Sequence, residues 1–596
     1  MRFADLVRVY AKIEATRKRL ETRALLADLL RTVPRPELPE VLYLSQGLLA
    51  PEYEGVELGV ADSLARRAVA IAIDRPEEEV AAHLRGSGDL GTSAEALGRD
   101  RLPRAAPPLE VSELFEGLRA IAAAAGDGSQ ETKIQLLAGL LARCSPEEAR
   151  YVARFVLGRL RLGVREMTIL DALAERWAGG TKYGREKIEA AFNLCSDLAL
   201  VAEALADGGL DGLSRIHLEV GRPIRPMLAE RVKDLPELLK RMEGRAALEY
   251  KYDGLRVQAH VPSKGPARLF SRRLEDITAQ FPELAEALPK ALRGRPAIVE
   301  GECVPIDPET DEIRPFQEVS RRRGRKYDLE RIQTEIPVCL FLFDILLGPE
   351  GPSIDEPLPR RRERLAALLA PHDQVRLAEQ QVVSTVEEAQ TFFDQSIAAG
   401  GEGVMAKSLS EESRYRAGAR GFWWIKYKRE YTVGLADSID GVVVGGFAGR
   451  GRRAGRWGAL LMAAYDPGQD RFESFCKVGS GFDDATLAKL PDLLKPFEVA
   501  ERPAGVVTGL VPDQWFTPGI VLEVRGAELS LSPIHHAGMG RIRAGVGFAL
   551  RFPRFTGRFR ADKKPTDATT VDELRELYRA QVKQAAPESP DEAPAP

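Results

Sequence analysis

The feature that most limits the fold of this chain is a change of sequence pattern near residues 221–226 (GRPIRP). Before it, apolar residues recur at steps of three and four, as in Leu6, Val9 and Ile13, which is typical of amphipathic helices. After it, short β-like stretches alternate with helical ones, and from Asp440 onward β-like runs and glycine turns dominate. A chain of 596 residues also exceeds what one hydrophobic core usually holds.

We therefore expect a multidomain chain. The predicted parts are an all-α domain over residues 1–213, an α+β domain over 214–436, a small β-barrel over 437–580 and a disordered acidic tail over 581–596.

The composition is that of an ordinary globular protein, with 44% hydrophobic and 29% charged residues. No apolar run approaches the length of a membrane span, and the first residues lack the pattern of a signal peptide. We expect a cytoplasmic protein that does not associate with a membrane. The 5 cysteines lie far apart without C-x-x-C spacing, which argues against a zinc site and favours buried thiols.

A net charge of −4 argues against a protein that coats nucleic acid nonspecifically, but it allows local basic patches to grip DNA. Two such patches occur, at residues 321–326 (RRRGRK) and 450–453 (RGRR). A solvated charged face explains either patch equally well.

The stretch around Lys251 concentrates ionisable residues. If residues 248–253 form a strand, Glu249, Lys251 and Asp253 share one face, because side chains alternate along a strand. A solvated face is the ordinary explanation for one such strand. Comparable polar stretches then recur at residues 298–302, 341–344, 401–405 and 424–428. Together they could enclose lysines, carboxylates and an aromatic ring in one cleft, which would suit a nucleotide and a divalent metal.

Residues 251–256 (KYDGLR) resemble the K-x-D-G-x-R motif of ATP-dependent DNA ligases and mRNA capping enzymes. The family's other motifs follow in order at residues 271–273, 300–302, 343–344, 402–403, 424–428, 551–555 and 560–563. Residues 158–164 and 168–173 are similar to the helical DNA-binding domain of archaeal and eukaryotic replicative ligases, and residues 529–533 to their OB-fold domain. One departure is that residues 555–558 are one residue longer than the family pattern, which leaves the register of Arg558 and Arg560 open.

The resemblance implies an all-α DNA-binding domain, an α+β adenylation (nucleotidyltransferase) domain and a β-barrel OB-fold domain. It also implies an ATP-dependent enzyme that seals nicks in duplex DNA during replication, repair and recombination. In such an enzyme Lys251 attacks the α-phosphorus of ATP and forms a lysyl-AMP intermediate. The AMP then passes to the 5′-phosphate of the nick and is displaced by the 3′-hydroxyl. We expect a monomer, and a sliding clamp is a further partner to consider.

The resemblance also assigns roles to individual residues. The predicted nucleotide-binding residues are Glu249, Arg256, Arg272, Glu302, Phe343, Arg420, Lys426 and Lys428. Glu302 and Glu402 would hold Mg²⁺, which prefers oxygen ligands. Arg560 and Lys563 would orient the pyrophosphate, and Arg159 and Arg161 would contact the DNA backbone. Neighbouring cations would favour the neutral, nucleophilic form of Lys251.

Several alternatives share part of this pattern. Capping enzymes and RNA ligases share the lysine motif, but the long helical domain and the ending at residues 560–563 argue against both. NAD-dependent ligases carry a four-cysteine zinc site, which the cysteine spacing excludes. A DNA-binding module with an inactive nucleotide site would have lost the lysine or the carboxylates. Residues 390–393 (QTFF) resemble a clamp-binding box, but they lie in an apparent amphipathic helix, so we expect Phe392 and Phe393 in the core.

Overall fold

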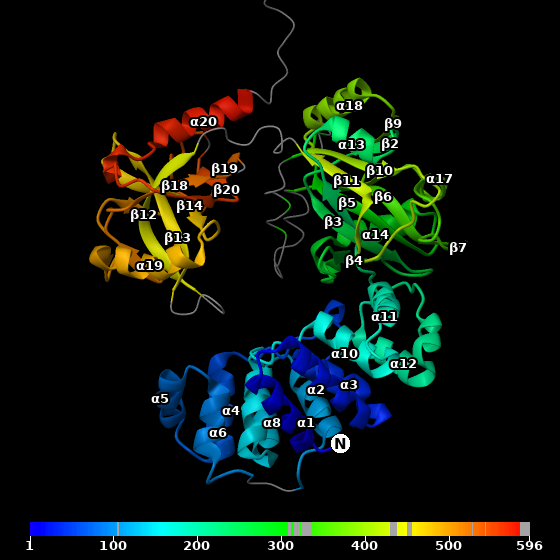
Figure 1. The fold of residues 1–596 in the computed structure, drawn as a ribbon, viewed down its shortest axis with the longest axis vertical. Coiled ribbons are helices and arrows are strands. Elements are labelled where there is room, and N and C mark those ends of the chain that lie inside the picture. Colours follow the sequence, from blue (N-terminus) through cyan, green and yellow to red (C-terminus); the bar gives the residue numbers. More distant parts are fainter. Residues whose placement is uncertain are drawn as a thin grey trace, which may run out of the picture. The chain divides into compact units, whose positions relative to one another are not determined.

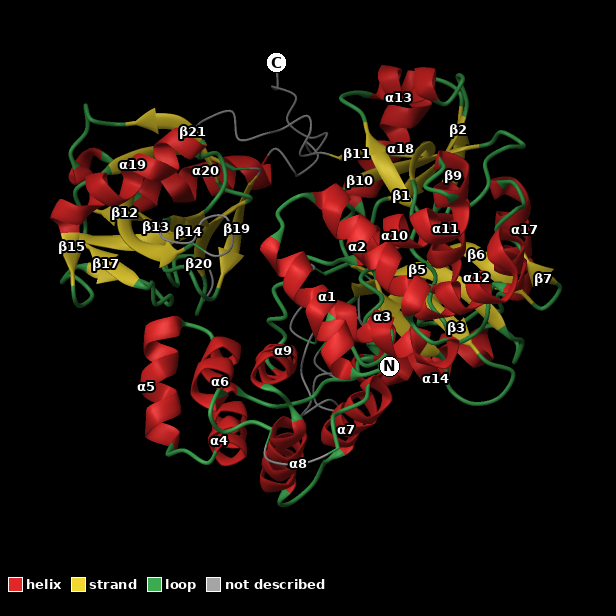
Figure 2. Cartoon of the chain, turned by 60° about the horizontal axis from the view of Figure 1, so that its bottom comes forward, coloured by secondary structure: helices red, strands yellow, loops and turns green. Residues whose placement is uncertain are grey.

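The computed structural model describes residues 1–103, 107–307, 312–314, 319, 322, 336–428, 438–449, 456–526, 528–542 and 544–583. The chain divides into two compact units. The first consists of Met1–Glu230, Asp253–Glu379 and Ser408–Trp424, and the second of Arg231–Tyr252, Gln380–Lys407 and Ile425–Pro596. Figures 1 and 2 show helices in the N-terminal part of the chain and strands together with further helices in the rest.

The N-terminal part of the first unit is built from helices, as the periodicity predicts. They are α1 (Phe3–Ala15), α2 (Arg19–Thr32), α3 (Leu38–Gln46), α4 (Asp62–Ile73), α5 (Glu77–Ser87), α6 (Leu90–Gly98), α7 (Val111–Ala123), α8 (Ser129–Arg143), α9 (Pro146–Val156), α10 (Glu166–Ala178), α11 (Lys182–Cys195) and α12 (Leu198–Gly212). Sequence signals start several of them: Ser145 and Glu148 form a capping box at α9, and Asp89 caps α6.

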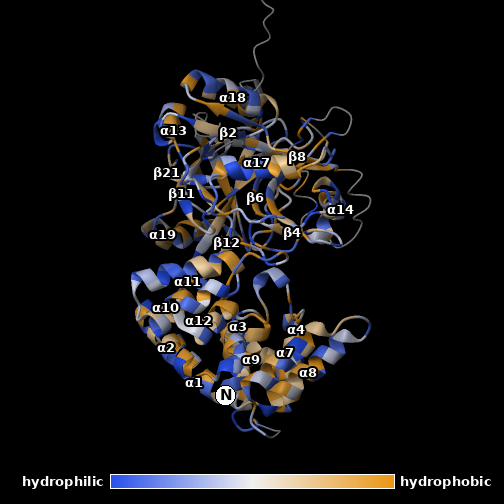
Figure 3. Ribbon diagram, turned by 90° about the vertical axis from the view of Figure 1, so that its right-hand side faces the viewer, coloured by the Kyte–Doolittle hydropathy of each residue, from blue (hydrophilic) through white to orange (hydrophobic). Residues whose placement is uncertain are grey.

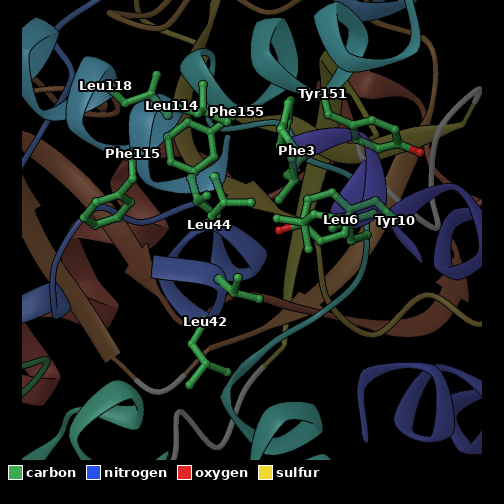
Figure 4. Close-up of a cluster of buried hydrophobic side chains, with 14 of the residues drawn as sticks. Phe3, Leu6, Tyr10, Leu42, Leu44, Leu114, Phe115, Leu118, Tyr151 and Phe155 are labelled. Atoms are coloured by element: carbon green, nitrogen blue, oxygen red, sulfur yellow. The ribbon is translucent and has the colours of Figure 1, made fainter. Parts of the chain in front are cut away.

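One hydrophobic core joins these helices. Figure 4 shows aromatic and leucine side chains from α1, α3, α7 and α9 meeting in it. Phe3 and Leu6 from α1 pack there with Phe155 from α9, and all three are at most 5% exposed. Helices such as α2 and α8 carry both hydrophobic and hydrophilic residues (Figure 3), and burial of their apolar side chains stabilises the bundle.

The first unit also contains a six-stranded sheet. Its strands are β3 (Leu255–Val261), β4 (Arg268–Ser271), β5 (Ala297–Pro305), β6 (Val338–Gly348), β7 (Gly351–Pro352) and β8 (Val375–Leu377). Their order is β4-β3-β5-β6-β7, with β8 beside β6. Helices α14 (Pro282–Ala291) and α17 (Leu358–Leu368) pack on the apolar face of this sheet, where Val257 and Ala259 of β3 lie.

A second sheet has the order β1-β11-β10-β2-β9. Its strands are β1 (Leu228–Arg231), β2 (Ala246–Tyr250), β9 (Gln380–Val383), β10 (Gly403–Ser408) and β11 (Arg420–Lys428). In the second unit, helices α13 (Leu235–Arg241) and α18 (Val386–Ala398) share a core with β2, β9, β10 and the end of β11. Phe392 and Phe393 of α18 are 5% and 6% exposed and belong to this core, which confirms the prediction made for them.

The C-terminal part of the second unit is rich in strands. They are β12 (Ile439–Ala448), β13 (Trp457–Asp466), β14 (Arg471–Val478), β15 (Glu498–Val499), β16 (Val506–Val507), β17 (Gln514–Phe516), β18 (Val521–Arg525), β19 (Glu528–Ser532), β20 (Gly547–Arg551) and β21 (Arg554–Phe559). The sheet order is β15-β17-β12-β13-β14-β16, and β18 pairs with β12 and β21. Helices α19 (Asp484–Leu494) and α20 (Val571–Lys583) bury apolar residues in its core.

Other expectations have mixed outcomes. All 5 cysteines are buried and free, as predicted. No helix within the described residues is long and apolar enough to cross a membrane. Arg322, predicted in a surface patch, is 1% exposed, because it pairs with Glu283 and donates to the carbonyl of Ile336 at 2.6 Å. The rest of that patch, the patch at 450–453 and the tail from residue 584 lie outside the described residues.

Candidate nucleotide site

Lys251 lies immediately after strand β2, which ends at Tyr250. The expectation that residues 248–253 form one continuous strand is therefore wrong. The backbone of Lys251 forms two hydrogen bonds with residues at the start of β10. Its N–H donates to the carbonyl of Gly403 at 2.9 Å, and its carbonyl accepts the N–H of Glu402 at 2.8 Å. The side chain is 20% exposed. These two backbone bonds, rather than strand alternation, bring Glu402 beside Lys251.

Glu402 forms ion pairs with both Lys251 and Lys428. Burial alone would raise the pKa of this carboxyl, but the two ammonium groups outweigh burial and lower the pKa. Gly403 allows its backbone to lie close to that of Tyr427. Its φ is +146°, and a Cβ at this position would lie 2.2 Å from the carbonyl oxygen of Tyr427. The structure thus unites three predicted residues. It adds a carboxylate contact on Lys251, whereas only neighbouring cations were expected to act on it.

Glu249, the predicted acceptor for the adenine amino group, is only 2% exposed. Its Oε2 lies 2.8 Å from Nζ of Lys407, and its Oε1 accepts a hydrogen bond of 2.8 Å from Gln380. Lys407 is itself 1% exposed. Burial of a polar group is costly unless the group is paired, so the contacts with Lys407 and Gln380 hold the Glu249 carboxyl in this position.

In the first unit, Arg256 lies against two aromatic rings. Its guanidinium carbon is 5.5 Å from the ring centroids of both Phe343 and Trp424. The two rings meet edge to face at 6.0 Å. Phe343, predicted to stack on adenine, remains partly exposed, whereas Trp424 is buried. This combination of a cation and aromatic faces suits a flat, electron-rich ligand.

Two carboxylates of the first sheet are buried in contacts with arginines, whereas a third is partly exposed. Asp344 accepts two hydrogen bonds from Arg361, at 2.8 and 3.0 Å, and neither side chain is exposed. Glu300 is 1% exposed and accepts a bond of 2.8 Å from Arg256. Glu302, the predicted metal ligand, lies opposite Arg256 in the β3–β5 register and is partly exposed.

The remaining predicted nucleotide residues have different surroundings. Arg272 follows β4 in a turn and is exposed, and Arg420 begins β11 and is exposed as well. Lys426 is partly buried on β11, two residues before Lys428.

Arg560 and Lys563 converge on Asp440 in the C-terminal part. The Oδ2 atom of Asp440 lies 2.6 Å from Nη1 of Arg560 and 2.7 Å from Nζ of Lys563. The pairing of β18 with β21 is irregular between Val524 and Leu522, where β21 runs from Phe555 to Phe559 and Gly557 has a φ of +94°. The chain recovers its register at Phe559, directly before Arg560.

Arg159 and Arg161 lie in the loop between α9 and α10, which also contains Gly158 and Gly163. Both side chains are at least half exposed, and they pair with Asp62 at 3.3 Å and Asp89 at 3.1 Å. Arg161 has a φ of +61°, a conformation that costs energy for a residue with a side chain.

Three residues with clear structural roles escaped the sequence reasoning: Lys407, Tyr415 and Gln258. Lys407 lies on β10, four residues after Gly403. The sequence Met405, Ala406, Lys407 gives no sign that the lysine is buried. Gln258 does lie two residues beyond Arg256 on one strand, so alternation could have placed both on one face.

Comparison with known proteins gives one consistent family. The family described as DNA ligase N terminus matches residues 2–174, the ATP dependent DNA ligase domain matches residues 226–428, and the ATP dependent DNA ligase C terminal region matches residues 453–563. The solved structure named Pmar-Lig_PreS3 is 16% identical with a TM-score of 0.55, covering 93% of this chain and 99% of that one, and it shares the overall fold.

Curated relatives match over nearly the whole chain. DNA ligase 2 of Thermofilum pendens is 47% identical, with 98% of this chain and 99% of the relative covered. The DNA ligase of Caldivirga maquilingensis is 43% identical, with 98% of each covered. The chain therefore belongs to the ATP-dependent DNA ligases, the enzymes that use ATP to seal nicks in DNA.

Proposed function

We propose that Lys251 is the nucleophile of this ligase and carries AMP as a phosphoramidate. The observation that supports this most directly is the position of its ammonium group, beside Glu402 and with Lys428 on the same carboxylate. Lys251 gives a proton to solvent, its nitrogen attacks the α-phosphorus of ATP, and the bond to the departing pyrophosphate breaks. The AMP then moves to the 5′-phosphate of the nick, and the 3′-hydroxyl displaces it.

The other predicted residues bind and orient the nucleotide. Lys426 and Lys428 place positive charge at the α-phosphate before the reaction begins. Phe343 stacks on adenine, and Arg256 with Arg272 binds ribose or phosphate oxygens. Arg420 binds the AMP phosphate. Glu249, whose carboxyl is held in place by Lys407 and Gln380, accepts the adenine amino group.

A divalent metal belongs to this proposal. Glu302 and Glu402 offer the carboxylate oxygens that Mg²⁺ prefers, so their chemistry fits the ion. Glu302 and Glu402 would hold the ion, which would supply positive charge to neutralise the phosphates.

We further propose that the strand-rich C-terminal part is an OB-fold domain over residues 437–580, after an adenylation domain over 214–436 and a DNA-binding domain over 1–213. Arg560 and Lys563 of the OB-fold domain orient the leaving pyrophosphate in the first step. Arg159 and Arg161 contact the phosphate backbone of nicked duplex DNA, since a sealing enzyme must act at any base sequence. The protein acts as a monomer.

A sealing assay on a 5′-labelled nicked duplex, with ATP and Mg²⁺, tests the role of Lys251. We expect Lys251→Ala to abolish sealing. The control variant Lys264→Ala, which changes an exposed lysine of the first unit, should retain it. Sealing by Lys251→Ala at the wild-type rate would refute the assignment.

A further inference from the structure

Strand β3 has a polar face with a regular arrangement. Arg256, Gln258 and His260 alternate with Val257 and Ala259, which point into the apolar core beneath α14 and α17. Gln258 lies opposite Glu300 of β5 in the register, and its Nε2 donates to Oε1 of Glu300 at 3.3 Å. We call Arg256, Gln258, His260 and Glu300 the polar ladder.

The polar ladder binds the backbone of residues 221–227, here called the linker segment, which follows the N-terminal helices. His260 Nδ1 accepts the N–H of Gly221 at 2.9 Å. Gln258 accepts the N–H of Ile224 at 2.8 Å and donates to its carbonyl at 3.1 Å. Arg256 donates to the carbonyl of Met227 at 2.8 Å. Every second residue of β3 thus fixes one position of the linker segment.

Tyr415 closes the ladder at the end occupied by Arg256. The side chain is 4% exposed and comes from the connection between β10 and β11. Its hydroxyl donates to Oε2 of Glu300 at 2.8 Å and accepts the N–H of Met227 at 2.9 Å. Arg256 donates to the same Glu300 oxygen at 2.8 Å. Burial and the Glu300 charge raise the pKa of Tyr415 well above its usual value, so the hydroxyl keeps its proton and remains a donor.

These contacts fix the guanidinium of Arg256 on two of its sides. Nη1 is bound to Met227 and Nη2 to Glu300, while Phe343 and Trp424 flank the group. The Nε atom of Arg256 is buried and has no hydrogen-bond acceptor among the described residues. A buried donor without an acceptor is costly, and a ligand oxygen would relieve that cost. The direction of this N–H depends on the contacts that hold the other two nitrogens.

We propose that Tyr415 is a positioning residue for nucleotide binding: its hydroxyl, through Glu300 and Met227, holds Arg256 in the orientation that receives the nucleotide. The inference rests on the proposed role of Arg256 in binding ribose or phosphate oxygens. It also makes nucleotide affinity depend on the linker segment, because Met227 takes part in both contacts. Tyr415 does not itself touch the nucleotide.

The test uses the full-length protein and Tyr415→Phe, which removes one hydroxyl and keeps the ring. Formation of labelled lysyl-AMP is followed at increasing ATP concentrations. We expect the KM for ATP to rise about fivefold, the factor expected for one lost hydrogen bond, while the maximal rate changes less than about twofold. Tyr43→Phe is the matched control, because Tyr43 also donates its hydroxyl to a carboxylate, that of Asp197 at 2.9 Å. Its KM should equal that of the wild type.

A double variant separates positioning from a general structural role. In an Arg256→Ala background, Tyr415→Phe should cause almost no further rise in KM, because the residue through which it acts is gone. An additional rise of about fivefold in that background, or an unchanged KM accompanied by a lower melting temperature in the single variant, would overturn the inference. If the wild-type protein forms no lysyl-AMP at all, the proposed function fails instead.

Discussion

Glu249 and Lys407 form an ion pair of 2.8 Å in which neither side chain is more than 3% exposed. Glu249 belongs to the motif next to Lys251, whereas Lys407 carries no sequence signal of its own. Removing one partner of a buried pair leaves a charge that neither water nor protein neutralises. The pair therefore ties the stability of the second unit to a residue of the proposed nucleotide site.

Lys407→Met should destabilise the protein by about 3–5 kcal/mol, because it leaves Glu249 charged and buried. Denaturant unfolding followed by circular dichroism measures the change. The double variant Lys407→Met with Glu249→Gln is the control, since it removes both charges and should lose less stability. Equal losses in the single and double variants would show that the charge is not the cause.

Acid should weaken the fold through His260. Burial, aided by the charge of Arg268, lowers the pKa of this histidine from 6.5 to about 3. The unfolded chain binds the proton near pH 6.5, whereas the folded chain does not. The contribution of His260 is therefore complete above pH 6.5 and is lost as the pH falls from 6.5 toward 3.

Between pH 6 and pH 4, His260→Gln should reduce the slope of unfolding free energy against pH by about 1.4 kcal/mol per pH unit. Denaturant unfolding at several pH values measures this slope. His217→Gln, at an exposed position, should leave the slope unchanged. A slope that is the same in His260→Gln and the wild type would contradict the account.

Much of the architecture follows from sequence periodicity. The three- and four-residue repeats place the N-terminal helices, and the capping residues mark where helices such as α9 begin. Boundaries set by tertiary contacts do not follow in this way. Strand β2 ends at Tyr250, because Lys251 turns its backbone toward Glu402, which lies 151 residues further along the chain, and toward Gly403.

Motifs in the sequence mark Lys251, Glu402 and Lys428, which the structure brings together, and their chemical roles stay predictions. Burial was harder to predict, because a charged residue in a run of letters looks the same whether it is solvated or paired. Arg322 and Lys407 are both buried through partners distant in sequence, Glu283 and Glu249. Tyr415 likewise gains its role from Glu300, which lies on another strand.

Arg560→Ala should slow lysyl-AMP formation by about a hundredfold, because a preorganised cation is lost from the pyrophosphate. Sealing of a nick that already carries AMP should proceed within about twofold of the wild-type rate, since pyrophosphate has already left. Arg558→Ala is the matched control: this arginine lies on β21, two residues before Arg560, is 67% exposed and should be silent in both assays. Equal slowing of both steps by Arg560→Ala would contradict the assignment.

Arg159 and Arg161 should contribute to the salt dependence of DNA binding. Replacing both by alanine should lower the slope of log affinity against log salt concentration by about 2, one unit for each phosphate contact. Fluorescence anisotropy with a labelled nicked duplex measures it. The double variant Arg8→Ala with Arg31→Ala is the control, because these exposed arginines each pair only locally, with Asp5 and Asp28. A slope equal to that of the wild type would exclude both loop arginines from the interface.

Covalent labelling tests the central role of Lys251 most directly. The protein is incubated with α-labelled ATP and Mg²⁺, separated under denaturing conditions, and then challenged with nicked duplex DNA. The account predicts label on the wild-type protein, none on Lys251→Ala, and discharge of the label by nicked DNA. Label that persists on Lys251→Ala, that remains on the protein after DNA is added, or that moves only to RNA 5′ ends would contradict it.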